Sequence, residues 1–259
     1  MMKNYSTSQM DNFYETLASG IAKPSGVMNY IQHLFVAERC YPGASVLDVC
    51  CGRALMIPLL KQYASHITKY VGVDISSSNL SDAQKAIHQM DDGTSEFSSY
   101  LLQGDVTDLS FLRPMQFDVV VYLSALEHLE KEAGSLSLHQ VSRMLSQKGT
   151  LYLSTPNTPS KSPRKLQYKV HVYEWSFDEI RMILNDLGLA VVQCIGLLPP
   201  PEEVLFELIV KKYGSDGGKW FRDMRSSLPN SFLAPIVASS FPESAREIML
   251  ICRKRLEAK

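Results

Sequence analysis

Short apolar runs alternate along the chain with segments that repeat apolar residues at helical spacing. A continuous apolar run is typical of a strand covered on both faces, and alternation with helices is typical of a parallel sheet. The pattern therefore predicts an α/β fold with a doubly wound, mostly parallel sheet of seven strands. The runs lie at Ser45–Cys50, Tyr70–Asp74, Tyr100–Gln103, Phe117–Leu123, Thr150–Ser154, Ala190–Gly196 and Ile248–Cys252.

Helices are expected between these strands. One begins at about Leu55, with Pro58 in its first turn, where the missing N–H costs little. The capping box Ser176-Phe177-Asp178-Glu179 predicts the start of another. Near the N-terminus, Pro24 and Gly26 are expected to separate two short helices. The helix that starts at the capping box is expected to cover Phe177–Leu187, and the other helices between strands Leu80–Met90 and Leu136–Leu145.

The regular alternation breaks at Pro199-Pro200-Pro201, before the last strand. The segment that follows predicts helices at Glu203–Tyr213, Lys219–Ser227 and Leu233–Ser239. We therefore expect the last strand to close an antiparallel hairpin interrupted by a helical cap. The chain is expected to be one domain, 1–259, with an N-terminal helical cap (1–44), a core (45–197), a helical insertion over the substrate (198–244) and a last strand with the C-terminus (245–259).

Composition narrows the function classes. The 259 residues carry a net charge of −1, which favours neither nucleic acid nor an anionic membrane as a partner. Five cysteines without a C-x-x-C pair argue against a disulfide framework or a zinc site. The first residues lack an apolar signal core, and no run approaches the roughly 20 apolar residues of a membrane span. We expect a cytoplasmic protein, and we leave a homodimer open.

Acidic residues follow three of the predicted strands. Asp48 ends the first apolar run before a loop of small residues, Asp74 ends the second, and Asp105 follows the third. Asp74 lies 22 residues beyond Gly52, where a carboxylate can accept hydrogen bonds from ribose hydroxyls. Asp105 could accept from an adenine amino group. These acids predict a pocket for a nucleoside that carries no phosphate.

With these motifs the chain resembles the class I S-adenosylmethionine-dependent methyltransferases, whose fold is Rossmann-like. The resemblance covers about Val46 to Asn157, and it implies S-adenosylmethionine as cofactor. The sequence departs from the family pattern at Cys50 and Ala54, where the family usually has glycine. The matching stretches are Val46–Gly52, Val71–Ser76, Gly104–Val106, Phe117–Val120, Leu126–Leu129 and Leu153–Asn157. The cofactor-binding residues that we expect are Asp48, Cys50, Gly52, Asp74, Ile75, Asp105, Val106 and Leu123, of which Ile75 and Val106 could equally be plain core.

Glu127 and His128 follow the fourth strand, from which the resemblance implies reach to the reacting methyl group. In ubiquinone-pathway O-methyltransferases a Glu three residues earlier joins such a pair to hold a metal. Here that residue is Ser124, so we expect no metal. His171 is the preferred general base, with a surface loop histidine as the alternative. For His128 the alternative is a helix-start hydrogen bond.

Four further residues are expected to contact the acceptor, each with a structural alternative. Tyr14 could close over the site or pack its helix, and Asn157 could face the substrate or form a turn. Tyr173 lies beside His171, where the family often places an aromatic residue. Trp220 could line an acceptor pocket or form the insertion's own core.

The expected function is methyl transfer from S-adenosylmethionine to an oxygen, nitrogen or carbon of a small molecule, in specialised metabolite biosynthesis. One alternative is a binding module for S-adenosylmethionine that has lost turnover. The other is a nicotinamide-dependent oxidoreductase, which ranks lower for two reasons. Cys50-x-Gly52-x-x-Leu55 lacks the glycines of a dinucleotide loop, and Asp48 would repel phosphates.

Overall fold

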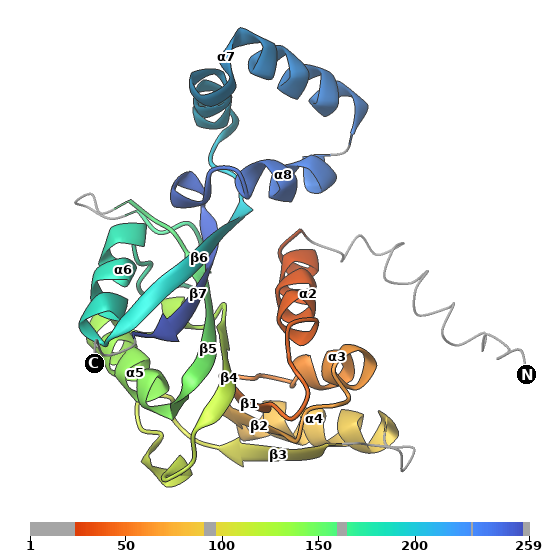
Figure 1. Cartoon of the computed structure of the whole chain (residues 1–259), viewed down its shortest axis with the longest axis vertical. Coiled ribbons are helices and arrows are strands. Elements are labelled where there is room, and N and C mark those ends of the chain that lie inside the picture. The colour runs from red at the N-terminus through yellow and green to blue at the C-terminus, as the bar shows by residue number, and fades with distance from the viewer. Residues whose placement is uncertain (1–23, 91–96, 160–164, 229, 256–259) are drawn as a thin grey trace, which may run out of the picture.

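The computed structural model describes residues 24–90, 97–159, 165–228 and 230–255. Its strands are β1 (Ser45–Val49), β2 (Lys69–Asp74), β3 (Ser98–Gln103), β4 (Phe117–Leu123), β5 (Leu145–Pro156), β6 (Leu189–Leu198) and β7 (Glu247–Lys254). They form one sheet in the order β3-β2-β1-β4-β5-β7-β6 (Figure 1). Strands β1 to β5 pair in parallel, whereas β7 is antiparallel to both β5 and β6. The predicted fold with its antiparallel last strand is confirmed.

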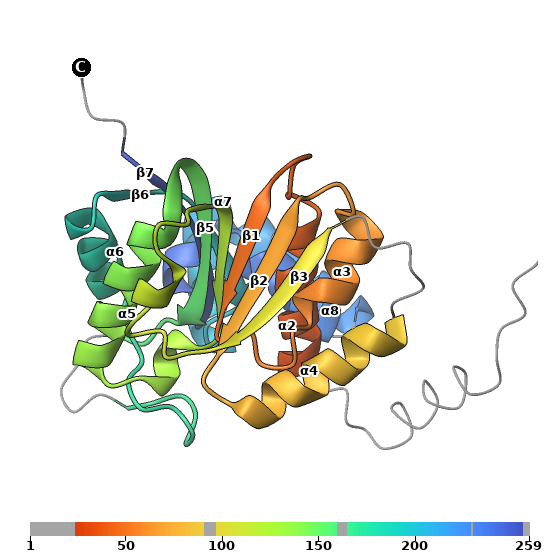
Figure 2. The ribbon, with the colours of Figure 1, turned by 90° about the horizontal axis from the view of Figure 1, so that it is seen from below.

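Helices cover both faces of this sheet. Figure 2 shows α5 (Lys131–Met144) and α6 (Phe177–Asp186) on one side, with α2 (Pro24–Ala37), α3 (Met56–Tyr63) and α4 (Ser77–Met90) on the other. A hydrophobic core fills each side: Leu138 and Leu184 belong to the first, and Val36 and Leu60 to the second. The two cores explain why the strands are continuous apolar runs, because both faces of each central strand are buried.

Several predicted boundaries differ from the structure. Helix α5 begins five residues before the predicted Leu136, because its first turn is polar and Glu130 provides no side-chain cap. Strand β5 begins at Leu145 rather than Thr150, since the exposed residues in its first half interrupt the apolar run. Helix α2 starts at Pro24 and continues through Gly26, so Gly26 does not end a helix. The first predicted N-terminal helix lies outside the described residues.

The insertion forms two helices, α7 (Glu202–Ser227) and α8 (Asn230–Ala238). Gly214, with φ 74° and ψ −173°, kinks α7 between the two helices that the sequence predicts there. Helix α8 packs against β6, and Figure 1 shows α7 farther out from the sheet. A small core of their own joins the two helices, made by Leu205, Ile209, Phe221, Leu233 and Val237. In the described ranges, no helix has both the length and the apolarity of a membrane span.

Candidate functional site

The loop after β1 has an unusual backbone. Cys50, Gly52 and Ala54 have φ of 58°, 54° and 55°, in the left-handed region. The loop is fixed by Cys51, whose N–H donates to the carbonyl of Val73 at 3.0 Å. Two of these three residues are not glycine, yet they adopt conformations that glycine adopts at no steric cost. The loop therefore keeps a glycine-type shape with only one glycine of the three.

Asp74 holds this loop against the start of α4. Its Oδ2 accepts the N–H of Gly52 at 2.8 Å, and its Oδ1 accepts the N–H of Ser76 at 2.8 Å. An ionised carboxylate offers about four lone-pair positions, so two backbone donors leave capacity for further hydroxyl donors. The buried Asp74 thus shapes the loop and retains acceptor capacity at the carboxyl end of β2.

Asp48 lies behind the loop rather than at its surface. Its side chain is buried, and the hydroxyl of Tyr70 donates to Oδ2 at 2.8 Å. Burial raises the pKa of Asp48 to about 7; the Tyr70 hydrogen bond opposes this change, and nearby Asp74 adds to it. Asp48 is therefore placed to support the loop from beneath.

The remaining predicted cofactor residues divide into exposed and buried. Ile75 is 68% exposed directly after β2, an accessible apolar surface beside Asp74. Asp105 is also exposed, and its Oδ1 accepts both the N–H and the hydroxyl of Thr107 at 2.8 Å. Val106 and Leu123 are buried and belong to the two cores, which for Val106 favours the core alternative.

Cys50 connects this loop to the residues after β4. Burial raises the pKa of its thiol to about 12, and four surrounding carboxylates add to this change. They belong to Asp74, Asp48, Asp105 and Glu127. The acids at the ends of β1, β2 and β3 therefore lie around Cys50 together with Glu127.

The loop has room for a ligand at Gly52. A Cβ built on this residue would meet no atom within 4 Å. Open space beside a glycine-type turn, with Asp74 and Asp105 at neighbouring strand ends, fits a nucleoside that needs hydrogen-bond acceptors and brings no phosphate charge. The residues present thus fit S-adenosylmethionine better than a dinucleotide.

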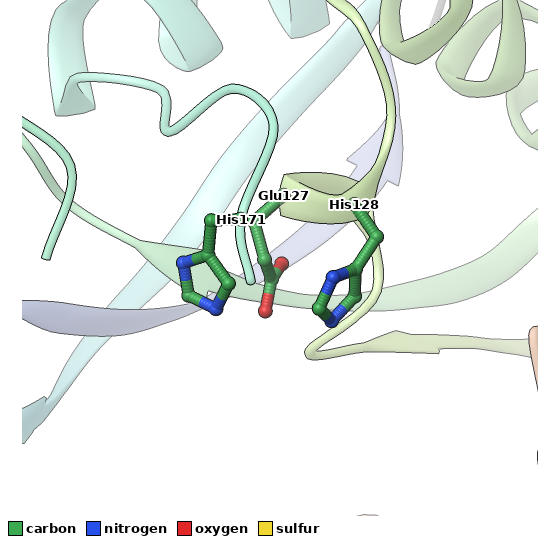
Figure 3. A group of neighbouring side chains, drawn as sticks. All are labelled: Glu127, His128 and His171. Carbon is green, nitrogen blue, oxygen red and sulfur yellow. The ribbon is translucent and has the colours of Figure 1, made fainter. Parts of the chain in front are cut away.

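A second cluster lies beside this loop. Glu127 and His128 belong to the short turn η2 (Leu126–His128), and His171 comes from the loop before α6. One ligand atom from each lies within 4.8 Å of the others. Figure 3 shows the carboxylate of Glu127 between the two imidazole rings. Two backbone bonds hold the loop there, because the carbonyl of Glu127 accepts the N–H groups of Val172 and Tyr173 at 2.8 and 3.2 Å.

His171 is oriented by a buried carboxylate. Its Nδ1 lies 2.6 Å from Oε1 of Glu174, which has no exposed surface. Glu174 is itself fixed by the N–H of Gln167 and the hydroxyl of Thr158. A carboxylate at Nδ1 fixes the tautomer and leaves Nε2 as the basic or metal-binding nitrogen.

Glu127 is a buried carboxylate with few partners. Its side chain is 3% exposed, and the hydroxyl of Thr155 donates to Oε2 at 3.3 Å. Burial raises the pKa of Glu127 to about 7, and Glu247 and Glu174 add to this change. A buried carboxyl of this kind can exchange a proton near neutrality or bind a cation.

The predicted acceptor residues are not gathered at this cluster. Asn157 donates to the carbonyls of Glu243 and Ala245, and its Oδ1 accepts the N–H of Phe177 at 2.8 Å, so we correct it to a structural role. The hydroxyl of Tyr173 donates to Glu179 at 2.8 Å, which ties it to α6. Tyr14 lies outside the described residues.

Trp220 lies in the insertion. It lines a pocket of about 270 Å³ whose other lining residues also come from the insertion, with no residue of the Glu127 cluster. Their side chains are mostly apolar or aromatic: Ile209, Tyr213, Gly217, Ile236, Val237, Ser240 and Phe241. The expected apolar pocket exists, but it belongs to the cap itself.

Sequence reasoning missed Glu174 and Thr155, which position His171 and Glu127. The sequence could have indicated Glu174, since it lies three residues after His171 and just before the capping box of α6. The sequence could not have indicated Thr155, because its contact with Glu127 depends on the placement of η2 beside the end of β5.

The chain is similar to known methyltransferases. Residues 46–149 match a family described as a methyltransferase domain. A ubiquinone biosynthesis O-methyltransferase of Pseudomonas syringae pv. tomato is 30% identical over 197 residues, which cover 69% of this chain and 79% of that protein. The protein of the same name from Xylella fastidiosa is 27% identical over 161 residues, or 60% of this chain. That match spans 61% of the relative, less than two thirds of its length.

Solved structures share the fold. The small RNA methyltransferase HEN1 aligns with a TM-score of 0.59 and 18% identity, covering 91% of this chain and 26% of that one. At this identity the likeness concerns the arrangement of strands and helices alone.

Proposed function

The chain belongs to the class I S-adenosylmethionine-dependent methyltransferases, and we propose that it methylates an acidic hydroxyl group of a small aromatic or enolic acceptor. The family membership follows from the match to the Pseudomonas syringae relative and agrees with the motifs from Val46 to Asn157. The relatives carry a ubiquinone-biosynthesis name, so the expectation of specialised metabolism has no support from them. Oxygen as the accepting atom remains part of the proposal.

One observation carries this proposal. His171 has its Nδ1 on the buried Glu174 at 2.6 Å, and Nε2 is left for the Glu127 and His128 cluster beside the cofactor loop. A base is needed for a hydroxyl acceptor, because a neutral hydroxyl is a poor nucleophile, while an amine needs none. An imidazole matches a phenol-type hydroxyl, with a pKa of about 10, far better than an aliphatic alcohol.

The reaction divides between cofactor and protein. Bound S-adenosylmethionine supplies an electrophilic methyl group on a sulfonium. The protein would hold the acceptor oxygen about 3 Å from the methyl carbon, as a near-attack geometry requires. Nε2 of His171 takes the hydroxyl proton as the oxygen–carbon bond forms, and Glu174 stabilises the imidazolium. S-adenosylmethionine would serve as the leaving group by keeping the electron pair of the carbon–sulfur bond as a thioether, and His171 then releases its proton to water.

Asp74 provides the test of cofactor binding. Asp74→Ala removes the acceptor that we assign to the ribose, and it should weaken S-adenosylmethionine binding by about 1.5–3 kcal/mol, or roughly 10- to 150-fold. Isothermal titration calorimetry measures this directly. Asp82→Ala is the matched control, because Asp82 is a partly exposed acid on α4 that pairs with Arg53 and Lys85. Equal affinities of parent and Asp74→Ala would refute the assignment.

Methyl transfer tests the acceptor class. We expect the chain to transfer labelled methyl to a diphenol, and to transfer little to a primary amine or a short oligoribonucleotide. His171→Asn should lower kcat by about 10²- to 10⁴-fold while S-adenosylmethionine affinity stays unchanged. Transfer to the amine or the oligoribonucleotide alone would refute the proposal. Binding without turnover on any acceptor would favour the non-catalytic module.

A further inference from the structure

We propose that Glu247, the first residue of β7, binds an ammonium group of the acceptor, so that the preferred substrate is a phenol that also carries a protonated amine. Gln32 of α2 supplies a second hydrogen-bond acceptor for this group. The inference rests on the proposed function, because it places the hydroxyl of the same molecule at His171. It adds a substrate class that the base alone does not define.

The sheet register places Glu247 at the same end of the sheet as the base. Pro156 of β5 pairs with Glu247, and the preceding residue, Thr155, donates to Glu127. Because β7 is antiparallel to β5, its first residue lies at the carboxyl ends of the parallel strands. The cofactor residues follow β1, β2 and β3, which lie on the other side of β4 in the strand order. Glu247 is thus on the acceptor side rather than the cofactor side.

Glu247 forms a polar group separate from the base. The cluster around His171, defined by ligand atoms within 4.8 Å of one another, does not include Glu247 among the described residues. The two are still near each other: burial raises the pKa of Glu247, whereas the Gln32 hydrogen bond and a charge on His171 oppose this change. A molecule that contacts both His171 and Glu247 therefore needs two polar groups with its body between them.

Gln32 brings an unsatisfied acceptor to this place. Its side chain is 1% exposed, and its Nε2 donates to Oε1 of Glu247 at 3.2 Å. An ionised carboxylate only accepts, so the nitrogen of the amide must face Glu247. The buried Oε1 of Gln32 has no hydrogen-bond partner among the described residues. Because both atoms belong to one planar amide, this oxygen lies beside the Glu247 carboxylate, and a donor from a ligand would remove the cost of leaving it unpaired.

No lysine or arginine neutralises the carboxylates of this place. In the described part of the chain, neither Glu127 nor Glu247 forms an ion pair with either residue type. The hydrogen bonds to Glu247 come from neutral groups of Gln32 and Ser124. Arg246 is near, but its effect on the pKa of Glu247 is smaller than that of the Gln32 hydrogen bond. Since a buried charge is costly unless it is paired, the site favours a cationic ligand.

An ammonium group fits these acceptors better than a hydroxyl. It carries a positive charge and three N–H donors, so one group can donate to both Glu247 and Oε1 of Gln32. A hydroxyl has a single donor and leaves the other acceptor unpaired. A protonated amine has no free electron pair, so a molecule held in this way presents its phenol oxygen, rather than its nitrogen, to the methyl group.

Two diphenols that differ only in the amine test the proposal. One carries an aminoethyl chain and the other an ethyl chain, and transfer of labelled methyl to oxygen is measured for both. We expect kcat/KM of the parent to favour the aminoethyl diphenol by about 10- to 100-fold, mainly through a lower KM. Glu247→Gln should lower this preference about tenfold or more. Glu243→Gln is the matched control, because it removes an exposed carboxylate four residues earlier and should retain the preference.

The preference distinguishes recognition from a structural role of Glu247. A contact that only holds α2 against β7 would, when lost, lower transfer to both diphenols and leave their ratio unchanged. If Glu247→Gln does not fold, Glu247→Asp replaces it and should lose part of the preference, because the charge stays on a shorter side chain. Equal kcat/KM for the two diphenols in the parent, or an unchanged ratio in the folded Glu247 variant, would overturn the proposal. Weaker S-adenosylmethionine binding by that variant would also overturn it, because the bound cation would then belong to the cofactor.

Calorimetry with the aminoethyl diphenol, in the presence of S-adenosylhomocysteine, separates this proposal from the proposed function. Binding that Glu247→Gln weakens about tenfold or more, with no transfer to the oxygen of either diphenol, would support the ammonium site and refute the function. Transfer to the oxygen of both diphenols with equal kcat/KM would leave the function standing and overturn the ammonium site.

Discussion

Cys50 and Ala54 adopt backbone angles that cost an L residue about 1–2 kcal/mol each. We therefore expect Cys50→Gly to raise the free energy of unfolding by up to about 1 kcal/mol, the gain being limited by the larger entropy of unfolded glycine. S-adenosylmethionine binding should be retained, since the loop shape does not change. Denaturant unfolding and calorimetry measure both quantities.

Gly52→Ala is the opposite control for this prediction. The φ of Gly52 is 54°, and open space surrounds the position of the missing Cβ. The substitution should therefore lower the free energy of unfolding through backbone strain alone. A loss of stability in Cys50→Gly instead would mean that the Cys50 thiol contributes more by packing than its backbone angle costs.

Because Asp48 is buried, we expect the free energy of unfolding to depend on pH. Its pKa is raised by burial to about 7 in the folded state and is about 4 in the unfolded chain. Between these values the folded protein holds the extra proton, so the contribution of this group to stability falls as pH rises from 4 to 7 and is constant above. Asp48→Asn keeps an acceptor for Tyr70 without the charge.

We therefore expect Asp48→Asn to be more stable than the parent at pH 8, by about 2 kcal/mol or more, with the difference shrinking towards pH 5. Urea unfolding at a series of pH values gives the difference. Asp118→Asn is a contrasting control, because hydrogen bonds from Ser45 and other hydroxyls, outweighing partial burial, hold the pKa of Asp118 below its usual range. A pH-independent difference for Asp48→Asn would contradict the assignment.

The residues of the site differ in how far the sequence could reveal them. Asp48 and Asp74 lie at the ends of β1 and β2, and Asp105 lies just beyond β3, so their convergence can be deduced from the ends of parallel strands. Thr155 cannot be found in this way, because its contact with Glu127 depends on the placement of η2 beside the end of β5. His171 is an intermediate case: its loop is recognisable, but two backbone bonds to Glu127 decide where it lies.

At the scale of elements, local signals explain which boundaries the sequence predicts well. The capping box Ser176–Glu179 fixes the start of α6, and the structure contains both of its hydrogen bonds. The start of α5 has no side-chain cap, and tertiary packing rather than sequence sets it. Strand β5 extends beyond its apolar run because β4 on one side and β7 on the other supply backbone partners.

Gly214 carries the kink of α7 and gives a prediction at this scale. Its combination of φ 74° and ψ −173° belongs to a region that is essentially restricted to glycine. Gly214→Ala should therefore lower the stability of the insertion by about 1–3 kcal/mol or straighten α7. Either change should disturb the edge contact of Tyr213 with Phe241, whose ring centroids lie 6.3 Å apart.

Thermal unfolding and the near-ultraviolet circular dichroism of the aromatic residues would measure these effects. Ser215→Ala is the matched control, because it alters the next residue of α7 without a special backbone angle. A Gly214→Ala protein with the stability and spectrum of the parent would show that the kink is not required.

For the whole molecule, the main question is what the insertion covers. Its two ends meet as the sequence predicts, since the N–H of Arg246 donates to the carbonyl of Leu198 at 2.7 Å. The structure differs from the expectation that the whole insertion covers the substrate. Helix α8 packs on β6, whereas α7 extends outwards and shares a core and a pocket with α8 (Figure 1). The insertion is thus a small unit joined to one edge of the sheet.

This arrangement makes removal of the insertion informative. Replacing 200–241 by a short glycine-serine linker keeps the hairpin of β6 and β7, and it keeps η3 (Pro242–Ser244) with its contact to Asn157. The sheet should fold, because both of its cores lie outside the replaced segment apart from the cover that α8 gives to β6. Stability should fall by about 1.5–3 kcal/mol for each large apolar side chain that becomes uncovered.

The shortened protein should bind S-adenosylmethionine with the affinity of the parent, because Asp74, Gly52 and Asp105 remain on the other part of the sheet. Its methyl transfer should fall, since water is then less well excluded from the acceptor. Calorimetry and the diphenol assay measure the two effects separately. Unchanged turnover and acceptor affinity would assign the insertion to another role, such as contact with a second copy. Loss of folding would instead show that α8 is part of the core, because β6 could not hold its place at the edge without it.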